Sequence, residues 1–454
     1  ARLADYHIRL KPGGNVAVLN MMLYFVVKGN LLNKEFVESR TEGFDKFKEH
    51  INSLDIDYLA EVAGVDKQQV KEAAIAYATA KNSMEFHGLG VTEHEQGSKT
   101  VMLIADLAMI TGNIGRKGVG VNPLRGQNNV QGAADMGCQP HQGAGYFPVA
   151  DKKIQDFYTE KYGVVHPTKA GLKIPEIFDA AINKEVKGLW IIGEDIVQTD
   201  PNSAHVVKAM ESLDLLVVQE IFLSETAKLA DVVLPGTTFL EKEGTFTNTE
   251  RRVQRVNKAA EPLPGTKPDG LIVTEMMQKL GYDQPVYDAD QVLAEVADVV
   301  PFFKGITRER LGKFGLQWPV KEDGTDTKIL HEKEFKLGKG RLKTFDWQES
   351  NELKNNKKEY PLILTTSRVL QHYNAATMTR RTKNLNIVDE DILLIHPKDA
   401  KNRELNTDDI ARLYSGRGEV SLKVEVTDKV KEGIVFTTFH FPEHMVNMVT
   451  GDGK

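Results

Sequence analysis

The chain has 454 residues, of which 41% are hydrophobic and 27% charged, and its formal net charge at pH 7 is −6. This length is too great for one hydrophobic core and predicts about three domains of a globular protein. The negative charge argues against a nucleic-acid partner. The apolar stretch of residues 16–27 is interrupted by Asn20 and is too short to span a bilayer, so we expect no membrane span.

Residues 1 to about 115 have the pattern of an α/β region. Apolar residues at helical spacing predict a helix over Asp66–Ala80, with Asp66 in a capping box. Ser83–His87 indicates a short strand that runs into the glycine-rich sequence of residues 88–92. A second helix is predicted over Ser98–Ile110.

The next informative segment is VGVNPLRGQNNVQGAADMG, residues 119–137. It places Arg125 among three side-chain amides, Gln127, Asn128 and Asn129. An arginine fork is a natural receptor for a small carboxylate, because two parallel N–H donors match two oxygens. Amides can read the polar edges of a cofactor. Taken alone, the segment is more typical of a surface loop rich in glycine and asparagine.

Cys138 follows this segment and is the single cysteine of the chain. One cysteine excludes an internal disulfide and an iron–sulfur cluster held by this chain's own cysteines. We interpret Cys138 as a buried thiol and not as a metal ligand.

Residues from about 185 to 235 alternate between strand and helix patterns. Apolar runs at Leu189–Ile192, Leu215–Val218 and Val232–Leu234 do not alternate with polar residues, and crossovers separate them. This predicts a parallel sheet. Ligands of such sheets lie outside the carboxyl ends of the strands, where Gly193–Thr199 and Gln219–Glu220 would be placed.

Residues 240–330 are charged and irregular, and we expect connecting and covering structure there, without a core of its own. The pattern after about residue 330 is all-β. Glu419–Val426 alternates strictly between apolar and polar residues, a hairpin turn at Ser415–Gly418 precedes it, and Ile434–Phe441 indicates a further strand. We predict a small closed barrel for this region.

The segment 119–137 closely resembles the catalytic large subunit of molybdenum- or tungsten-dependent formate dehydrogenases, of the bis-molybdopterin guanine dinucleotide oxidoreductase family. The resemblance extends in the same order over essentially the whole chain. It implies an α/β fold with Rossmann-like parallel sheets, followed by a C-terminal β-barrel of the double-psi type. It also implies four divisions: an α/β core domain (1–117), an α/β nucleotide-binding domain with the arginine loop (118–240), a connecting region (241–328) and a dinucleotide-binding barrel (329–454).

The resemblance further implies roles for particular residues. Arg125 would hold formate, and Gln127 would contact a pterin. The sequence GLGVTEHEQG, residues 88–97, matches a loop that approaches one pterin, so its first residues would line the cofactor: Gly88, Leu89 and Gly90.

GEDIVQTD, residues 193–200, matches a loop that holds a guanine. The resemblance assigns the guanine to Asp195, with Gly193, Thr199 and, at the next strand end, Gln219 beside the nucleotide. An Asp after Gly is also typical of a turn or helix cap.

In TTSRVLQHYNAATMTRR, residues 365–381, the family pattern places three side chains at a pterin: Arg368, His372 and Asn374. His372 also fits a purely structural role. The usual aromatic–Gln pair of the family appears here as Phe439-His440, which makes a pterin contact there doubtful.

The resemblance implies oxidation of formate to CO2, or the reverse, with two molybdopterin guanine dinucleotides carrying Mo or W. The metal-ligating Cys or selenocysteine, the proton-accepting His and a 4Fe–4S cluster are expected in a part upstream of Ala1. Electron-transfer subunits, iron–sulfur or linked to NAD or ferredoxin, are the expected partners, and the expected location is cytoplasmic. Two alternatives stay open: another molybdopterin oxidoreductase such as a nitrate reductase, and an inactive cofactor-binding fragment.

Overall fold

The computed structural model describes residues 3–451, so Ala1, the start of the resemblance, lies outside the described residues. The chain divides into two compact units, each discontinuous in sequence. The first unit comprises Ala1–Asp135, Phe246–Gln254 and Ala297–Lys354. The second comprises Met136–Thr245, Arg255–Val296 and Asn355–Lys454. The four divisions expected from the sequence stay a prediction.

The first unit is mainly helical. Its central helix α1 (Asn15–Lys28) is apolar on most sides, because it packs against four other helices: α3 (Phe44–Ser53), α4 (Ile56–Ala63), α5 (Lys67–Thr79) and α7 (Gly97–Ile110). The fully buried Met21 and Leu23 of α1 lie in the resulting core. The predicted helices 66–80 and 98–110 are confirmed within one residue at each end, and Asp66 caps α5 by accepting from the backbone N–H of Gln68.

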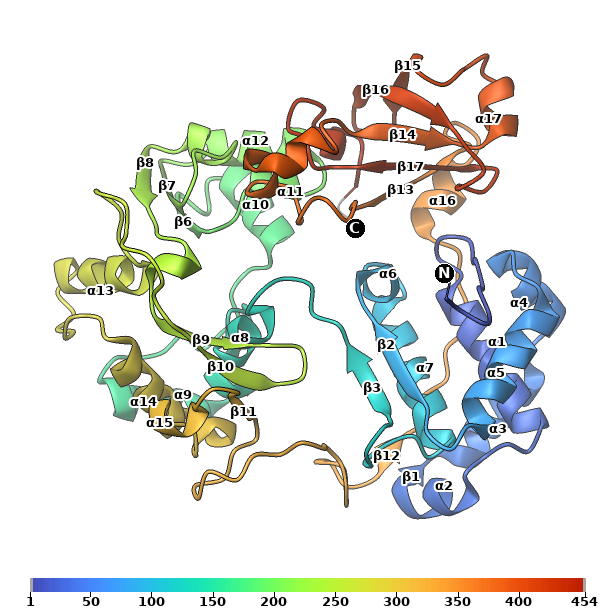
Figure 1. Cartoon of the computed structure of the whole chain (residues 1–454), viewed down its shortest axis with the longest axis horizontal. Coiled ribbons are helices and arrows are strands. Elements are labelled where there is room, and N and C mark those ends of the chain that lie inside the picture. Colours follow the sequence, from blue (N-terminus) through green and yellow to red (C-terminus); the bar gives the residue numbers. More distant parts are fainter. Residues whose placement is uncertain (1–2, 452–454) are drawn as a thin grey trace. The chain divides into compact units, whose positions relative to one another are not determined.

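A short parallel pair of strands completes this unit. β2 (Met84–His87) pairs with β3 (Gly120–Pro123), with His87 opposite Pro123 at their carboxyl ends (Figure 1). The predicted strand 83–87 is therefore confirmed. The short helix α6 (Leu89–Thr92) follows β2, and α8 (Val130–Asp135) follows the loop after β3.

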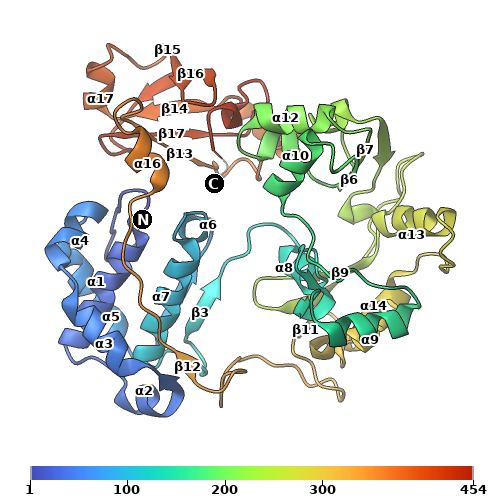
Figure 2. The ribbon, with the colours of Figure 1, turned by 180° about the vertical axis from the view of Figure 1, so that it is seen from behind.

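In the second unit, the predicted parallel sheet is confirmed. β6 (Gly188–Ile192), β7 (Leu215–Glu220) and β8 (Val232–Pro235) form it in that order. α10 (Ile174–Ile182) and α12 (Ser203–Glu211) lie beside this sheet (Figure 2). Their apolar residues share a buried cluster with β7.

A five-stranded mixed sheet forms the C-terminal part of the second unit, in the order β13-β17-β14-β16-β15. Its strands are β13 (Ile363–Ser367), β14 (Ile392–Ile395), β15 (Ile410–Tyr414), β16 (Glu419–Val426) and β17 (Ile434–Thr438). The alternation predicted for β16 is confirmed, because Val420, Leu422 and Val424 are buried.

The prediction of a closed barrel is wrong, because the edge strands β13 and β15 do not pair with each other in the part of the chain that the structure describes. Alternation fixes which face of a strand is buried. It carries no information on whether two edge strands distant in sequence meet.

The prediction of irregular structure for residues 240–330 is also wrong. This region holds β9 (Gly244–Thr247), β10 (Arg252–Val256) and β11 (Leu316–Gln317), which form a sheet in the order β11-β10-β9. It also holds α13 (Asp269–Lys279), α14 (Ala289–Val299) and α15 (Arg308–Leu311). Their many charged residues mask a narrow apolar face, which in α14 includes the buried Leu293 and Val299.

A further helix of the second unit is α9 (Lys152–Tyr162). The other helices and strands are short: α2 (Lys34–Arg40), β1 (Thr41–Glu42), β4 (Gln142–Gly143), β5 (Phe147–Pro148), α11 (Ile196–Thr199), β12 (Gly340–Arg341), α16 (Asn351–Asn356) and α17 (Pro397–Lys401). Among the described residues, no helix combines the length and the apolar character that crossing a membrane requires.

Candidate functional site

Two predicted site segments of the first unit follow the carboxyl ends of paired strands. Gly88–Gly90 comes directly after β2, and the loop with Arg125 comes directly after β3. The backbone N–H of Leu124 donates to the His87 carbonyl oxygen at 2.7 Å, so the two segments start side by side. Parallel strands present ligand sites at this edge. Leu89 is exposed, and a Cβ added at Gly90 would meet no atom within 4 Å, so the segment borders open space.

The arginine loop is attached to residues 246–254 at two points. The backbone N–H of Arg125 donates to Oγ1 of Thr249 at 3.1 Å, and this hydroxyl donates to the Pro123 carbonyl oxygen at 2.6 Å. Oδ1 of Asn129 accepts from the backbone N–H of Thr247 at 2.9 Å. The loop is therefore held in one conformation by the neighbouring hairpin.

Gly132 permits the second of these attachments. A Cβ at this position would lie 2.0 Å from Oδ1 of Asn129, well inside the contact limit. The backbone of Asn129 is left-handed, with φ at +59°, which asparagine tolerates better than most residues. Gly132 therefore leaves room for the Asn129 side chain, and asparagine suits the backbone at position 129.

The guanidinium of Arg125 keeps a free positive charge. Its Nε donates to Oε1 of Gln131 at 3.2 Å, while the residue is exposed and forms no ion pair within residues 3–451. Gln127 is also exposed. A positive fork held along one edge and open at its other nitrogens is suited to bind a small carboxylate.

The second unit gathers acidic side chains at the carboxyl ends of β6 and β7. Burial, together with the charge of the nearby Glu194, raises the pKa of Asp200 to about 6. Burial likewise raises the pKa of Glu220, with the charges of Asp195 and Glu194 adding to the effect. A partner rich in N–H donors would stabilise these carboxylates.

Asp195, predicted to hold a guanine, is buried and already engaged. Its Oδ1 accepts from the backbone N–H of Thr226 at 2.9 Å and from the Thr226 hydroxyl at 2.8 Å. Its Oδ2 accepts from the backbone N–H of Glu225 at 3.4 Å. Asp195 thus anchors the segment after β7. Thr199 donates from its hydroxyl to Oε1 of Glu194 at 2.9 Å.

Gln219 retains an unused acceptor. Its Nε2 donates to Oδ1 of Asp269 at 2.8 Å, whereas its Oε1 is buried and has no hydrogen-bond partner in the described residues. Gly193, at the end of the neighbouring strand, has φ at +66° and no atom within 4 Å of an added Cβ. A buried amide oxygen of this kind is costly unless a ligand donates to it.

Gln198 joins the loop after β6 to the C-terminal sheet, and sequence reasoning missed it. Its Nε2 donates to the carbonyl oxygens of Ala375 at 2.9 Å and His440 at 3.0 Å. Its Oε1 accepts from Nη1 of Arg380 at 3.0 Å. The predicted segments 193–199 and 367–374 are therefore brought together within the second unit.

The three residues predicted at a pterin differ in exposure. Arg368 is exposed, lies 4.9 Å from the ring centroid of Phe439 and donates from Nη2 to Oδ1 of Asn374 at 3.2 Å. His372 is buried, and both ring nitrogens are used: Nε2 lies 2.8 Å from the Val388 carbonyl oxygen and Nδ1 lies 3.0 Å from Oγ1 of Thr379. In this geometry His372 positions the loop, and Arg368 and Asn374 remain the accessible members.

His440, the departure from the family pattern, supports the same loop. Its Nδ1 donates to the Asn374 carbonyl oxygen at 2.7 Å, so its Nε2 is the acceptor for the Val369 backbone N–H at 3.1 Å. Burial lowers the pKa of His440, which favours this neutral form. Asp391 holds the strand end by accepting from the backbone N–H groups of His440 and Phe441.

The prediction that Cys138 is buried is wrong, because the thiol is exposed. It follows Gly137, whose left-handed backbone (φ +80°) turns the chain at the surface after α8. Small apolar residues are buried on average, but a turn overrides that tendency.

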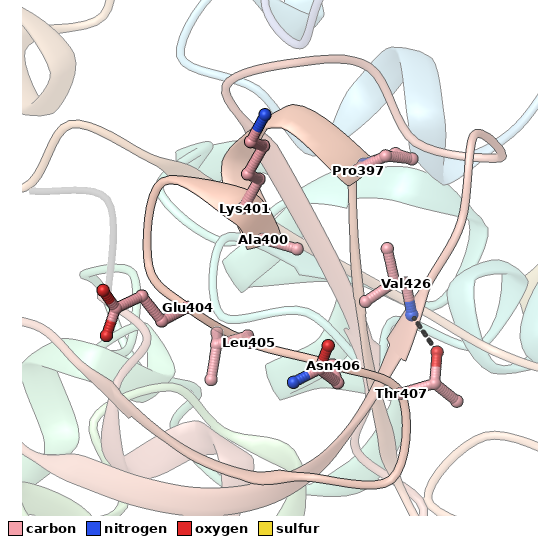
Figure 3. Close-up of a pocket in the computed structure, with 8 residues that line it drawn as sticks. All are labelled: Pro397, Ala400, Lys401, Glu404, Leu405, Asn406, Thr407 and Val426. Atoms are coloured by element: carbon pink, nitrogen blue, oxygen red, sulfur yellow. Dashed lines mark hydrogen bonds between the residues drawn. The ribbon is translucent and has the colours of Figure 1, made fainter.

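A separate pocket lies beside α17 and β16, lined by Pro397, Ala400, Lys401, Glu404, Leu405, Asn406, Thr407 and Val426 (Figure 3). Oγ1 of Thr407 accepts from the Val426 backbone N–H at 3.1 Å, which joins two of the lining residues (Figure 3). None of the predicted site residues lines this pocket.

The matches to known protein families cover the segments that contain the predicted site residues. Residues 1–279 match the family described as molybdopterin oxidoreductase, and residues 362–454 match the molydopterin dinucleotide binding domain. The chain is 44% identical to the F420-dependent formate dehydrogenase subunit alpha of Methanocaldococcus jannaschii, over 99% of this chain and 67% of that protein. It is 36% identical to formate dehydrogenase H of Escherichia coli, over 97% of this chain and 63% of that protein.

Among solved structures, acetylene hydratase from Pelobacter acetylenicus aligns with a TM-score of 0.75 at 20% identity, over 100% of this chain and 68% of that one. A likeness at this identity concerns the fold alone. The chain spans about two thirds of the length of these relatives.

Proposed function

The chain belongs to the molybdopterin oxidoreductase family, and on this premise we propose that it is the catalytic alpha subunit of a formate dehydrogenase. The observation that carries the proposal is Arg125, an exposed guanidinium fixed along its Nε edge in a loop that two hydrogen bonds attach to the adjacent hairpin. A relative named a formate dehydrogenase subunit aligns with 99% of this chain at 44% identity.

The proposed role of Arg125 is to bind and orient the substrate. Formate is a small planar carboxylate, and the two Nη nitrogens of a guanidinium match its two oxygens. Holding formate in one orientation places its C–H bond toward the reacting partner, which is a proximity effect. The exposed Gln127, two residues further along the same loop, is the proposed pterin contact.

The cofactor we propose is molybdopterin guanine dinucleotide, in two copies carrying Mo or W. The residues at the ends of β6 and β7 fit its guanine, because Gln219 offers a buried unpaired acceptor and Asp200 and Glu220 offer carboxylates with raised pKa values. Asp195 would act at this site through the segment it anchors. Gly88–Gly90, Arg368 and Asn374 are the proposed pterin contacts. When bound, the cofactor supplies the metal centre that accepts two electrons from formate.

We also propose an iron–sulfur cluster and partner subunits for the electron transfer. Cys138 alone cannot hold an iron–sulfur cluster, so we place the expected 4Fe–4S cluster outside these 454 residues. Electron-transfer subunits would receive the electrons, and a cytoplasmic location and the four domain divisions are retained as proposals.

The test is reduction of a viologen dye by the holoenzyme that contains this chain, with formate as the only electron donor. Formate-dependent reduction that scales with Mo or W content is the expected result. If formate does not reduce the dye and nitrate instead oxidises the reduced dye, the protein is an oxyanion reductase and the proposal is wrong. A metal-loaded protein inactive with all of these substrates would favour the inactive fragment.

A further inference from the structure

A line of hydrogen bonds connects the exposed Arg125 to the interior of the first unit. After Nε of Arg125 donates to Oε1 of Gln131, Nε2 of Gln131 donates to Oδ1 of Asp135 at 2.9 Å. Nε1 of Trp318 donates to Oδ2 of the same carboxylate, also at 2.9 Å. Gln131 and Asp135 are four residues apart on α8 and share one face of it. Asp135 is completely buried.

The far end of this line is fixed by packing. The ring of Trp318 lies 4.7 Å from that of Phe302 and 5.4 Å from the guanidinium carbon of Arg251. Arg251 also donates from Nη1 to the Trp318 carbonyl oxygen. The indole N–H therefore has little freedom to move away from Asp135.

The chemistry of the carboxylate sets the direction of every bond in the line. A carboxylate only accepts, so Gln131 must turn its amide nitrogen toward Asp135 and its oxygen toward Arg125. The opposite orientation would place the amide N–H2 group against the Nε–H of Arg125, donor against donor. Asp135 thus determines whether Arg125 has an acceptor at its Nε edge.

We propose that Asp135 is a positioning residue for substrate recognition, acting through Gln131 to hold the Nε edge of Arg125 and leave its two Nη nitrogens for the carboxylate. This inference rests on the proposed formate dehydrogenase function. Because Nε is occupied, formate is bound end-on by the Nη pair, and the plane of the guanidinium sets the plane of the substrate.

Because each hydrogen bond has a fixed direction, the role of Asp135 can be tested by moving its negative charge to position 131. In Asp135→Asn, the Asn oxygen accepts from Trp318 and its amide donates toward Gln131, which must then flip and present a donor to Arg125. In the double variant Asp135→Asn with Gln131→Glu, each donor faces an acceptor again, and the net charge equals that of the original chain. A carboxylate that served only the stability of the fold would not make formate affinity follow this loss and recovery.

The measurements are formate KM and kcat of the metal-loaded holoenzyme, and formate binding followed by line broadening of 13C-formate. For Asp135→Asn we expect KM and the dissociation constant to rise roughly tenfold to a hundredfold, since one charge-assisted contact is misplaced, with a smaller change in kcat. The double variant should recover most of this loss. Asp106→Asn, which changes another buried aspartate of the same unit outside this line of hydrogen bonds, is the control and should keep the original KM.

Unchanged formate affinity in Asp135→Asn, or a double variant no better than the single one, would overturn the inference. Should Asp135→Asn not fold, Gln131→Met removes the acceptor at Arg125 while Asp135 keeps Trp318, and the same rise in KM is required. Arg125→Lys distinguishes the substrate role of Arg125 from the positioning role of Asp135. If it leaves formate affinity unchanged, the substrate site itself is wrong; if it weakens affinity and Asp135→Asn does not, only the positioning role is wrong.

Discussion

Gln198 and His440 are 242 residues apart in sequence, yet Nε2 of Gln198 donates to the His440 carbonyl oxygen at 3.0 Å. The same amide reaches the carbonyl oxygens of Ala375 and Phe439, and its oxygen accepts from Arg380. One buried side chain thus connects the loop after β6 with two segments of the C-terminal sheet region. These hydrogen bonds hold the loop after β6 and the two segments in a fixed arrangement.

Gln198→Ala should destabilise the second unit by about 2–3 kcal/mol, because buried carbonyl oxygens and the Arg380 guanidinium lose a partner. The midpoint of denaturant unfolding measures this. Gln155→Ala, which removes a single bond to the Val149 carbonyl oxygen in the same unit, is the control and should cost about 1 kcal/mol or less. If both substitutions lowered the unfolding free energy equally, Gln198 would not have the connecting role inferred from its hydrogen bonds.

Gly132→Ala should disturb the arginine loop, because the new Cβ would lie 2.0 Å from Oδ1 of Asn129 and displace it from the Thr247 backbone N–H. We expect a loss of about 1–3 kcal/mol in unfolding free energy, the usual scale for overpacking. Gly126→Ala is the matched control, since a Cβ there meets nothing within 4 Å. A stability of Gly132→Ala equal to that of Gly126→Ala would show that the loop adapts freely.

From the raised pKa of Asp106 we predict that the unfolding free energy falls as the pH rises. It is buried on α7, and burial raises its pKa from 3.8 to about 8, against the opposing effects of the Lys343 backbone N–H and charge. The folded state therefore holds a proton that the unfolded state releases near pH 4, and this contribution declines until about pH 8. Relative to Asp106→Asn, the original chain should lose stability between pH 5.5 and about 8 and then level off. Parallel pH profiles of the two proteins would contradict this assignment.

From the lowered pKa of His440 we predict that the unfolding free energy rises with pH in the acidic range. Its pKa is lowered in the folded state, because the imidazole is buried and its Nε2 must stay unprotonated to accept from Val369. Stability is full above the ordinary histidine pKa of about 6.5 and falls as the pH drops below it. His440→Gln keeps one donor and one acceptor without titrating, so the difference from the original chain should widen from pH 6.5 to 5.5. The groups that face the ring are Asp391, His372 and Arg368.

The sequence predicted those parts of the fold that carry a local apolar pattern. β6, β7 and α7 have continuous or helically spaced apolar residues, and the structure confirms them. α13 and α14 were missed because their exposed faces are charged and their apolar faces are narrow. The open C-terminal sheet and the exposed Cys138 depend on edge pairing and a turn that no local pattern specifies.

The candidate site shows the same division. The strand-end rule predicted the positions of Gly193 and Gln219. Arg125 and Gly88–Gly90 were assigned from the family resemblance, and only the structure shows that they follow the ends of paired strands and start side by side. Gln198, Asp135 and Asp391 act through partners far away in sequence, such as Trp318 for Asp135, so no spacing indicates them. His372 and Asp195 were predicted from their loops, but their internal hydrogen bonds become visible only in three dimensions.

The central claim is that Arg125 is the formate receptor of a formate dehydrogenase, and the most direct test is formate KM for Arg125→Lys at equal metal content. Lysine keeps the charge but lacks the planar pair of donors, so about 1.5–3 kcal/mol of binding should be lost. This corresponds to a rise in KM of roughly tenfold to a hundredfold, with unchanged Mo or W per chain. A fully metallated Arg125→Lys enzyme with the original formate KM would contradict the account.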